Sequence, residues 1–100
     1  MSTDISFLSR LEEIITTRID NPSEDSYVSQ LVASGDKRVA QKLGEEAVEL
    51  SLAAVAGDSQ EQLNEAADLV FHLLVLLKSK NLTLQDVAVT LQQRHEMSAK

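Results

Sequence analysis

Apolar residues recur at helical spacing along most of the chain. In residues 4–18, Leu8, Leu11 and Ile15 follow one another at intervals of three and four, which predicts an amphipathic helix. We expect this helix to end before Pro22, because proline disfavours helical geometry at the residue that precedes it. Ser26 then has the residue type of an N-cap, and it predicts a short helical turn that ends near Gly35.

Two longer helices are predicted in the middle of the chain, over residues 36–56 and 58–80. Asp36 is the expected N-cap of the first, and Gly57 is a natural stop at its end. Asp58 and Glu61 have the spacing of a variant capping box for the second. The first helix has an apolar stripe of Val39, Leu43, Ala47, Leu50 and Ala54, and the second has one of Leu63, Ala66, Ala67, Val70, Leu73, Leu74 and Leu77.

The segment from Val70 to Leu77 is apolar on nearly every side of its helix. Such a helix is covered on more than one face, and in so short a chain we expect part of the cover to come from a second subunit. Thr83 and Asp86 begin a last helix that ends near residue 96, and residues 97–100 are expected to fray. The pattern predicts an all-α fold, a bundle of about four to five helices completed by homodimerisation.

Length and composition fit one globular domain over residues 1–100. Three glycines and one proline supply little turn chemistry for an all-β fold. The chain has no cysteine, which excludes disulfides, thiolate zinc sites and a cysteine nucleophile. The N-terminus lacks a signal-peptide pattern, and the longest apolar run is far shorter than the roughly 20 residues of a membrane helix. We therefore expect a cytoplasmic protein that does not enter membranes.

The formal net charge of −7 bears on the class of ligand. Nonspecific binding of nucleic acid, or of an anionic membrane surface, needs a basic surface, so both are disfavoured. A small phosphorylated substrate remains compatible, because a bound metal ion inverts the local sign of charge.

Acidic residues gather on both central helices. The first carries Glu45, Glu46 and Glu49, and the second carries Glu65 and Asp68. The short connection between the helices makes them antiparallel, so the pair at 46 and 49 can face the pair at 65 and 68. Four carboxylates form an all-oxygen site that suits Mg²⁺, or Mn²⁺, better than zinc or copper. The expected chemistry is metal-assisted cleavage at a phosphoanhydride.

Each of these signals has a plainer interpretation that the sequence leaves open. The acids can form a solvated helix face, and Lys42 can pair with Glu46 across one turn instead of binding phosphate. His72 lies one turn past Asp68 and is a ligand, a base or a hydrogen-bonded structural residue. Gly44 inside a helix indicates either a close approach of another group or simple tolerance, at a cost of about 1 kcal/mol.

A family resemblance rests on several short stretches of this sequence. They are Asn21-Pro22 with Ser26-Tyr27, then Lys42-x-Gly44-Glu45-Glu46-x-x-Glu49, then Asn64-Glu65-Ala66-Ala67-Asp68, then His72-Leu73-Leu74, and last Arg94-His95. The paired acidic motif resembles that of the all-α nucleoside-triphosphate pyrophosphohydrolases, the MazG-like superfamily. The Ser-Tyr loop, the Lys-x-Gly and the terminal Arg-His narrow the resemblance to the phosphoribosyl-ATP pyrophosphatase family of histidine biosynthesis. Asp25 and Val28 depart from the family loop, which commonly has Gly and Thr there.

The resemblance implies an enzyme that hydrolyses phosphoribosyl-ATP to phosphoribosyl-AMP and pyrophosphate with Mg²⁺, as a homodimer. Members of the family are often fused to a cyclohydrolase domain that uses cysteines; because this chain has no cysteine and no room for that domain, we expect the stand-alone form. Metal ligands carried over from the family are Glu46, Glu49, Glu65 and Asp68. Catalytic roles fall on Glu45, Glu46 and Glu49, with Glu45 as a further ligand or as a base that orients water. Contacts with substrate are expected from Lys42, Ser26, Tyr27, Lys37, Arg38 and Arg94.

Two other functions stay open at this point. One is a house-cleaning pyrophosphatase of noncanonical or deoxynucleoside triphosphates, which would use the same acids. The other is a non-catalytic helical adaptor or dimerisation module, whose acids would only be solvated. The glycine beside the clustered acids, and the small residues Ala53 and Ala56 in line with them, favour an enzyme.

Overall fold

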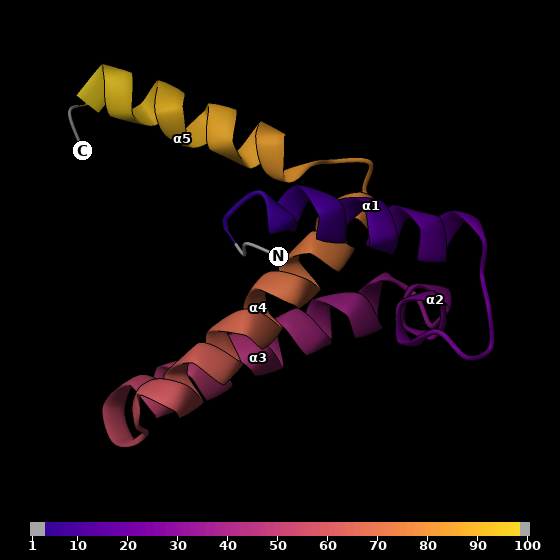
Figure 1. Cartoon of the computed structure of the whole chain (residues 1–100), viewed down its shortest axis with the longest axis horizontal. Coiled ribbons are helices and arrows are strands. Elements are labelled where there is room, and N and C mark those ends of the chain that lie inside the picture. Colours follow the sequence, from indigo (N-terminus) through magenta and orange to yellow (C-terminus); the bar gives the residue numbers. More distant parts are fainter. Residues whose placement is uncertain (1–3, 99–100) are drawn as a thin grey trace.

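The computed structural model describes residues 4–98, and within that range every regular element is a helix. The elements are α1 (Phe7–Asp20), α2 (Tyr27–Ala33), α3 (Asp36–Ala56), α4 (Ser59–Ser79) and α5 (Leu84–Ser98). Figure 1 shows α3 and α4 as a long antiparallel pair, α1 across the C-terminal half of α4, and α5 projecting away from the other helices. The predicted all-α class is confirmed. Across the described part of the chain, no helix is long and apolar enough to cross a membrane.

Local capping accounts for most of the helix boundaries. The side chain of Ser26 accepts a hydrogen bond from the backbone N–H of Ser29 at the start of α2, and Asp58 accepts one from Glu61 at the start of α4. Thr83 precedes α5 with a full capping box: its N–H donates to Asp86, and its hydroxyl accepts from the Asp86 N–H. These three predicted starts are confirmed because they depend only on residues three positions apart.

The expected N-cap at Asp36 is wrong. Gly35 holds that position with φ of +102°, a backbone conformation that favours glycine, and Asp36 is the first helical residue. The carboxylate of Asp36 instead forms an ion pair with Lys80, the C-cap residue of α4. This ion pair ties the start of α3 to the end of α4. The last helix also continues to Ser98, so its end is not frayed at residue 97; residues 99 and 100 lie outside the described range.

The core lies where α1, α2, α3 and the C-terminal half of α4 meet. Its fully buried side chains are Ile15, Leu74 and Val75, and the others are Val28, Leu31 and Val39. Within the Val70–Leu77 segment, Leu74, Val75 and Leu77 are buried by their own chain, whereas Val70, Phe71, Leu73 and Leu76 are only half-buried. The expectation that a second subunit supplies part of the cover stays a prediction. Exposed apolar surface also lies nearer the N-terminus of α4, where Leu63 is 65% exposed.

A candidate active site between the third and fourth helices

Three carboxylates meet where α3 crosses α4. One oxygen from each of Glu46, Glu49 and Glu65 lies within 4.8 Å of the other two. Glu46 and Glu49 share a face of α3 because they are three residues apart. The short turn at Gly57 and Asp58 folds α4 back so that Glu65 reaches them. Glu46 is buried, Glu65 is half-buried and Glu49 is exposed, so the group opens to solvent on the Glu49 side.

Two of the three carboxylates each bury an oxygen atom, which is unusual for acidic side chains. Atom Oε2 of Glu46 and atom Oε2 of Glu65 are both buried and have no hydrogen-bond partner. Leaving a buried acceptor unsatisfied costs about 1–3 kcal/mol, and more for a charged group. Adjacent like charges add to this cost. A divalent cation removes both penalties, and an all-oxygen donor set is the one that Mg²⁺ prefers. The residues present therefore fit the metal that the acid pattern predicts.

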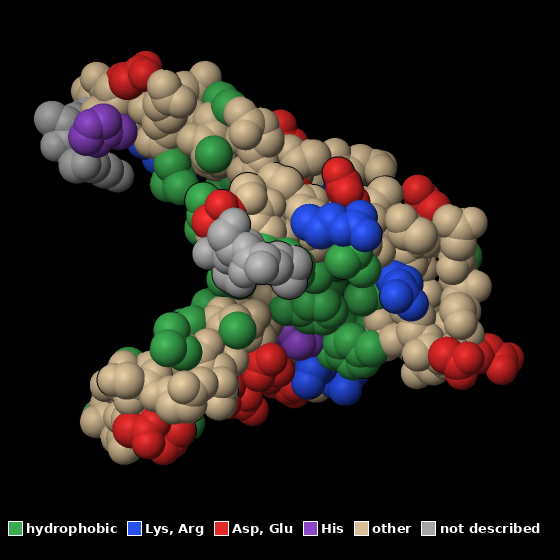
Figure 2. Space-filling view, in the orientation of Figure 1, with side chains coloured by type: hydrophobic (Ala, Val, Ile, Leu, Met, Phe, Trp, Pro, Cys, Tyr) green, Lys and Arg blue, Asp and Glu red, His purple; other side chains and the backbone are tan. Residues whose placement is uncertain are grey.

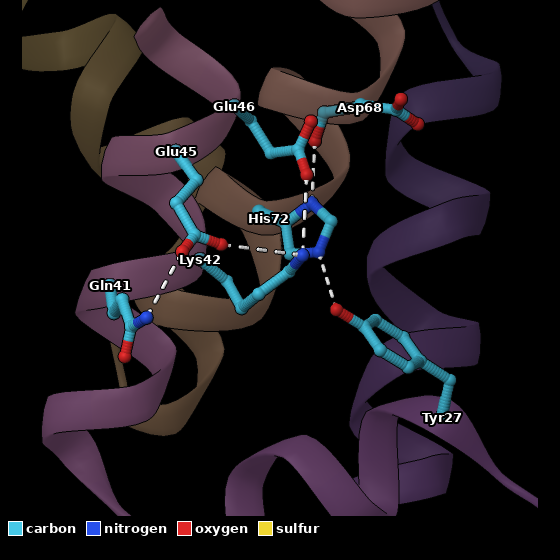
Figure 3. A network of polar contacts seen from close by, with 7 residues as sticks. All are labelled: Tyr27, Gln41, Lys42, Glu45, Glu46, Asp68 and His72. Carbon is cyan, nitrogen blue, oxygen red and sulfur yellow. Dashed lines mark hydrogen bonds and ion pairs between the residues drawn. The ribbon is translucent and has the colours of Figure 1, made fainter. Parts of the chain in front are cut away.

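Asp68 is not part of this group of three. It is exposed, and Figure 3 shows its carboxylate pointing away from Glu46. Its main-chain oxygen is the part that faces the site, where it accepts a hydrogen bond from Nδ1 of His72 at 2.7 Å. The structure thus brings together three of the four predicted ligands.

Lys42 stands at one side of the acids. Its Nζ lies 3.6 Å from an oxygen of Glu45 and 3.6 Å from Oε1 of Glu46. The other oxygen of the Glu46 carboxylate, Oε2, is the one without a partner. Burial acts to lower the pKa of Lys42, but the fields of Tyr27, Glu46 and Glu45 outweigh it and raise the pKa above its ordinary value. The ammonium therefore stays charged throughout the neutral pH range, as a phosphate contact requires.

Glu45 is held apart from the group of three acids. Gln41, one turn earlier, donates a hydrogen bond to its carboxylate at 3.0 Å, and Lys42 lies on the other side. The hydrogen bond from Gln41, with the charges of Lys42 and Arg38, lowers the pKa of Glu45. Sequence reasoning missed Gln41, although its spacing of four residues from Glu45 is the signal that identifies the contact.

The Tyr27 side chain reaches the site from the start of α2. Its hydroxyl lies 2.7 Å from Nε2 of His72 (Figure 3), and its ring stacks on Phe71 with centroids 6.2 Å apart. His72 is buried, whereas Tyr27 is 48% exposed. The sequence leaves three roles open for His72, and the structure shows it as a hydrogen-bonded residue.

The other residues predicted to contact substrate lie in different parts of the structure, and not all of them are near the acids. Ser26 is buried, and its hydroxyl serves as the cap of α2. Lys37 and Arg38 are exposed in the first turn of α3, with Arg38 close enough for its charge to act on Glu45. Arg94 lies in the C-terminal half of α5, which Figure 1 shows far from the middle of α3 and α4.

A hollow of about 380 Å³ extends from the acids toward the turn between the two long helices. It is lined by Glu49, Leu52, Ala53, Ala56, Gly57, Glu61, Asn64 and Glu65. The room expected beside Ala53 and Ala56 is thus present, and two of the three grouped acids face it. The grouped acids are thus bordered by this hollow, next to Glu49 and Glu65, and by Lys42, next to Glu46.

Comparison with known proteins gives a consistent family match. The profile of the phosphoribosyl-ATP pyrophosphohydrolase family matches residues 8–95. Similar curated proteins include the histidine biosynthesis bifunctional protein HisIE of Pasteurella multocida, 52% identical over 89% of this chain, and that of Yersinia pestis, 47% identical over 95% of it. The HisIE protein of Photobacterium profundum is 48% identical over 89% of the chain. The matches cover only 44%, 47% and 43% of these three relatives, so the chain spans less than half of their length.

Proposed function

The chain belongs to the phosphoribosyl-ATP pyrophosphohydrolase family, and from that premise we propose that it hydrolyses phosphoribosyl-ATP to phosphoribosyl-AMP and pyrophosphate. The observation that carries the proposal is the pair of buried carboxylate oxygens without partners, on Glu46 and Glu65, grouped with Glu49. A solvated helix face does not bury unpartnered charge, whereas a site that takes Mg²⁺ together with a polyphosphate does so in its ligand-free form.

Each side chain of the site receives a role in this proposal. Glu46, Glu49 and Glu65 would hold Mg²⁺, and the bound ion would supply Lewis-acid stabilisation of charge on the phosphoryl oxygens. Glu49 is the most exposed of the three and therefore faces the substrate and the attacking water. Asp68 lies one turn farther along α4, and its exposed side chain would have to rotate toward the group to serve as a fourth ligand.

The basic side of the site binds the phosphates. Lys42 is its central cation, with Arg38 and Lys37 farther along the same helix toward its N-terminus. Glu45 acts here by holding Lys42 at 3.6 Å. A carboxylate whose pKa is lowered is a weak base, so we assign Glu45 this positioning role instead of proton abstraction from water.

The test is pyrophosphate release in the presence of Mg²⁺ from phosphoribosyl-ATP, dUTP, dCTP and ATP, compared side by side. We expect turnover of phosphoribosyl-ATP at least about 100-fold above the others in kcat/KM, equivalent to about 2.7 kcal/mol of discrimination. Turnover confined to deoxynucleotides would replace this substrate by the house-cleaning alternative. No turnover of any member, by protein that binds Mg²⁺ normally, would favour the adaptor alternative.

We also propose that the working unit is a homodimer. An almost wholly apolar groove of about 390 Å³ lies between α1 and α4, lined by Phe7, Leu8, Leu11, Leu63, Ala66, Ala67, Val70 and Phe71. Figure 2 shows hydrophobic side chains gathered between these two helices, beside a histidine and a run of acidic side chains. Contiguous apolar surface of this kind marks an interface. In such a dimer Arg94, remote from the acids of its own chain, contacts substrate at the site of the second copy.

A further inference from the structure

The hollow between the end of α3 and the start of α4 has an apolar side as well as acidic side chains. Leu52, Ala53 and Ala56 supply the apolar side, and Leu52 is 65% exposed. The volume of about 380 Å³ falls in the range of about 300–1,000 Å³ that is typical of small-molecule sites. Two alanines beside an exposed leucine leave room for the face of a flat ring.

Glu61 supplies a negative charge at the end of the hollow that lies toward the turn. It belongs to the first turn of α4 and lies outside the group of three acids. Its Oε2 lies so close to the turn that a Cβ atom added at Gly57 would come within 2.9 Å of it. Among the described residues, no ion pair or hydrogen bond engages this carboxylate, and no lysine or arginine lines the hollow.

The order of groups along α3 indicates which part of a nucleotide reaches the hollow. Lys42, Glu49 and Ala56 follow one another on one face of the helix, because seven residues make nearly two turns. Each step is about 10 Å along the helix axis. In the proposed function Lys42 meets phosphate and Glu49 faces the attacking water. A nucleotide bound in this order places its base beyond Glu49, in the hollow.

The base of phosphoribosyl-ATP differs chemically from the base of ATP. Its adenine ring is alkylated on N1, which turns the N1–C6–N6 group into an amidine and makes it a much stronger base than the ring of ATP. The protonated amidine is a cation with N–H donors on N6. A carboxylate accepts a charge-assisted hydrogen bond from such a cation, which is roughly twice as strong as a bond between neutral groups.

We propose that Glu61 is a specificity-determining residue: it binds the N1-alkylated adenine as a cation in the hollow between α3 and α4, and so favours that substrate over ATP. This rests on the proposed function, which supplies the substrate. The ring lies against Leu52 and Ala56, and an N–H group on N6 donates to the Glu61 carboxylate. Glu49 and Glu65 border the same hollow but are engaged by the metal, so Glu61 is the acid left to meet the base.

The test compares two isomeric ligands that differ in charge. They are the α,β-methylene analogues of 1-methyl-ATP, a cation at neutral pH, and of N6-methyl-ATP, whose ring is neutral. Neither can be cleaved between the α and β phosphorus atoms, so calorimetry with Mg²⁺ measures binding alone. We expect the 1-methyl analogue to bind about five- to tenfold more tightly, the size of one charge-assisted hydrogen bond at an exposed site.

Two acid substitutions then separate Glu61 from the overall charge of the protein. Glu61→Gln should bring the ratio of the two affinities to within about twofold of unity, because the amide has no charge. Glu24→Gln removes an exposed acid outside the hollow and should leave the ratio unchanged. Equal binding of the two isomers by the unsubstituted protein, or a ratio that survives Glu61→Gln, would overturn the proposal.

Ala56→Leu tests the place of the base independently of charge. Ala56 is exposed, so the longer side chain fills the hollow without disturbing the core. We expect it to weaken both analogues at least about fivefold and to leave the affinity for pyrophosphate within about twofold. Undiminished nucleotide binding would show that the base lies elsewhere. If all variants behave as expected but the protein releases no pyrophosphate from phosphoribosyl-ATP, the hollow remains a site for a cationic purine and the proposed function fails.

Discussion

Glu46 on α3 and Glu65 on α4 each bury one carboxylate oxygen that has no hydrogen-bond partner, and the two side chains offer oxygens within 4.8 Å of each other. The fold therefore brings two carboxylates together although one buried oxygen of each is left without a hydrogen-bond partner.

Loss of one acid from the group should weaken metal binding, and loss of a neighbouring acid should not. We expect Glu65→Gln to weaken Mg²⁺ or Mn²⁺ binding by at least about tenfold, a typical size for damage to a metal site. Glu61→Gln, one turn earlier on the same helix and outside the group, is the matched control and should change the affinity less than twofold. Equal losses in both variants, measured by calorimetry, would show that the group of three is not the binding site.

Glu46→Gln should stabilise the metal-free protein. The substitution removes a buried charge and supplies an amide donor beside Glu65, so the free energy of unfolding in chelator should rise by about 1 kcal/mol. Addition of Mg²⁺ should raise the unfolding midpoint of the unsubstituted protein and have little effect on the variant. Urea unfolding with and without the metal checks both expectations, and a variant destabilised in chelator would contradict them.

Gly44→Ala separates two reasons for a glycine inside α3. A Cβ atom at Gly44 would meet nothing within 4 Å in the single chain. The substitution should therefore stabilise the isolated fold by about 0.5–1 kcal/mol, through helix propensity. If a second copy or the substrate approaches Gly44, the same variant should lose dimerisation or raise KM. Gain of stability with unchanged assembly and kinetics would show that the glycine is merely tolerated.

A charge in the α1–α4 groove should break the dimer. Leu63 is 65% exposed and lines that groove, so Leu63→Glu would have to bury an unpaired carboxylate in an interface there. We expect sedimentation at micromolar concentration to show dimer for the unsubstituted protein and monomer for this variant. Ala33→Glu, an exposed position on α2, should leave the dimer intact. A monomeric unsubstituted protein would remove the homodimer from the proposed function.

Local sequence rules predicted most of the helix boundaries. The caps at Ser26, Asp58 and Thr83 were predictable because each satisfies an N–H group only three residues away. Asp36 was assigned wrongly for a related reason: its side chain has the capping chemistry, but the positive φ at the boundary is available to Gly35 and not to an aspartate without strain. The cover that α1 and α2 give to the Val70–Leu77 segment was not predicted, since their packing onto α4 joins residues far apart in the chain.

In the candidate site, too, some features follow from the local sequence and others only from the tertiary structure. The sequence by itself determined that Glu46 and Glu49 share one face of α3, that Glu65 lies on a helix folded back against it, and that the acids have basic residues nearby. All of these follow from the period of the helix and a short turn. Only the tertiary structure decided which acids meet. The rotation of α4 about its axis brings Glu65 inward and leaves the Asp68 carboxylate in solvent, and the path of α2 brings Tyr27 to His72, 45 positions away. Such rotations are set by side-chain packing across the whole core, which no local pattern records.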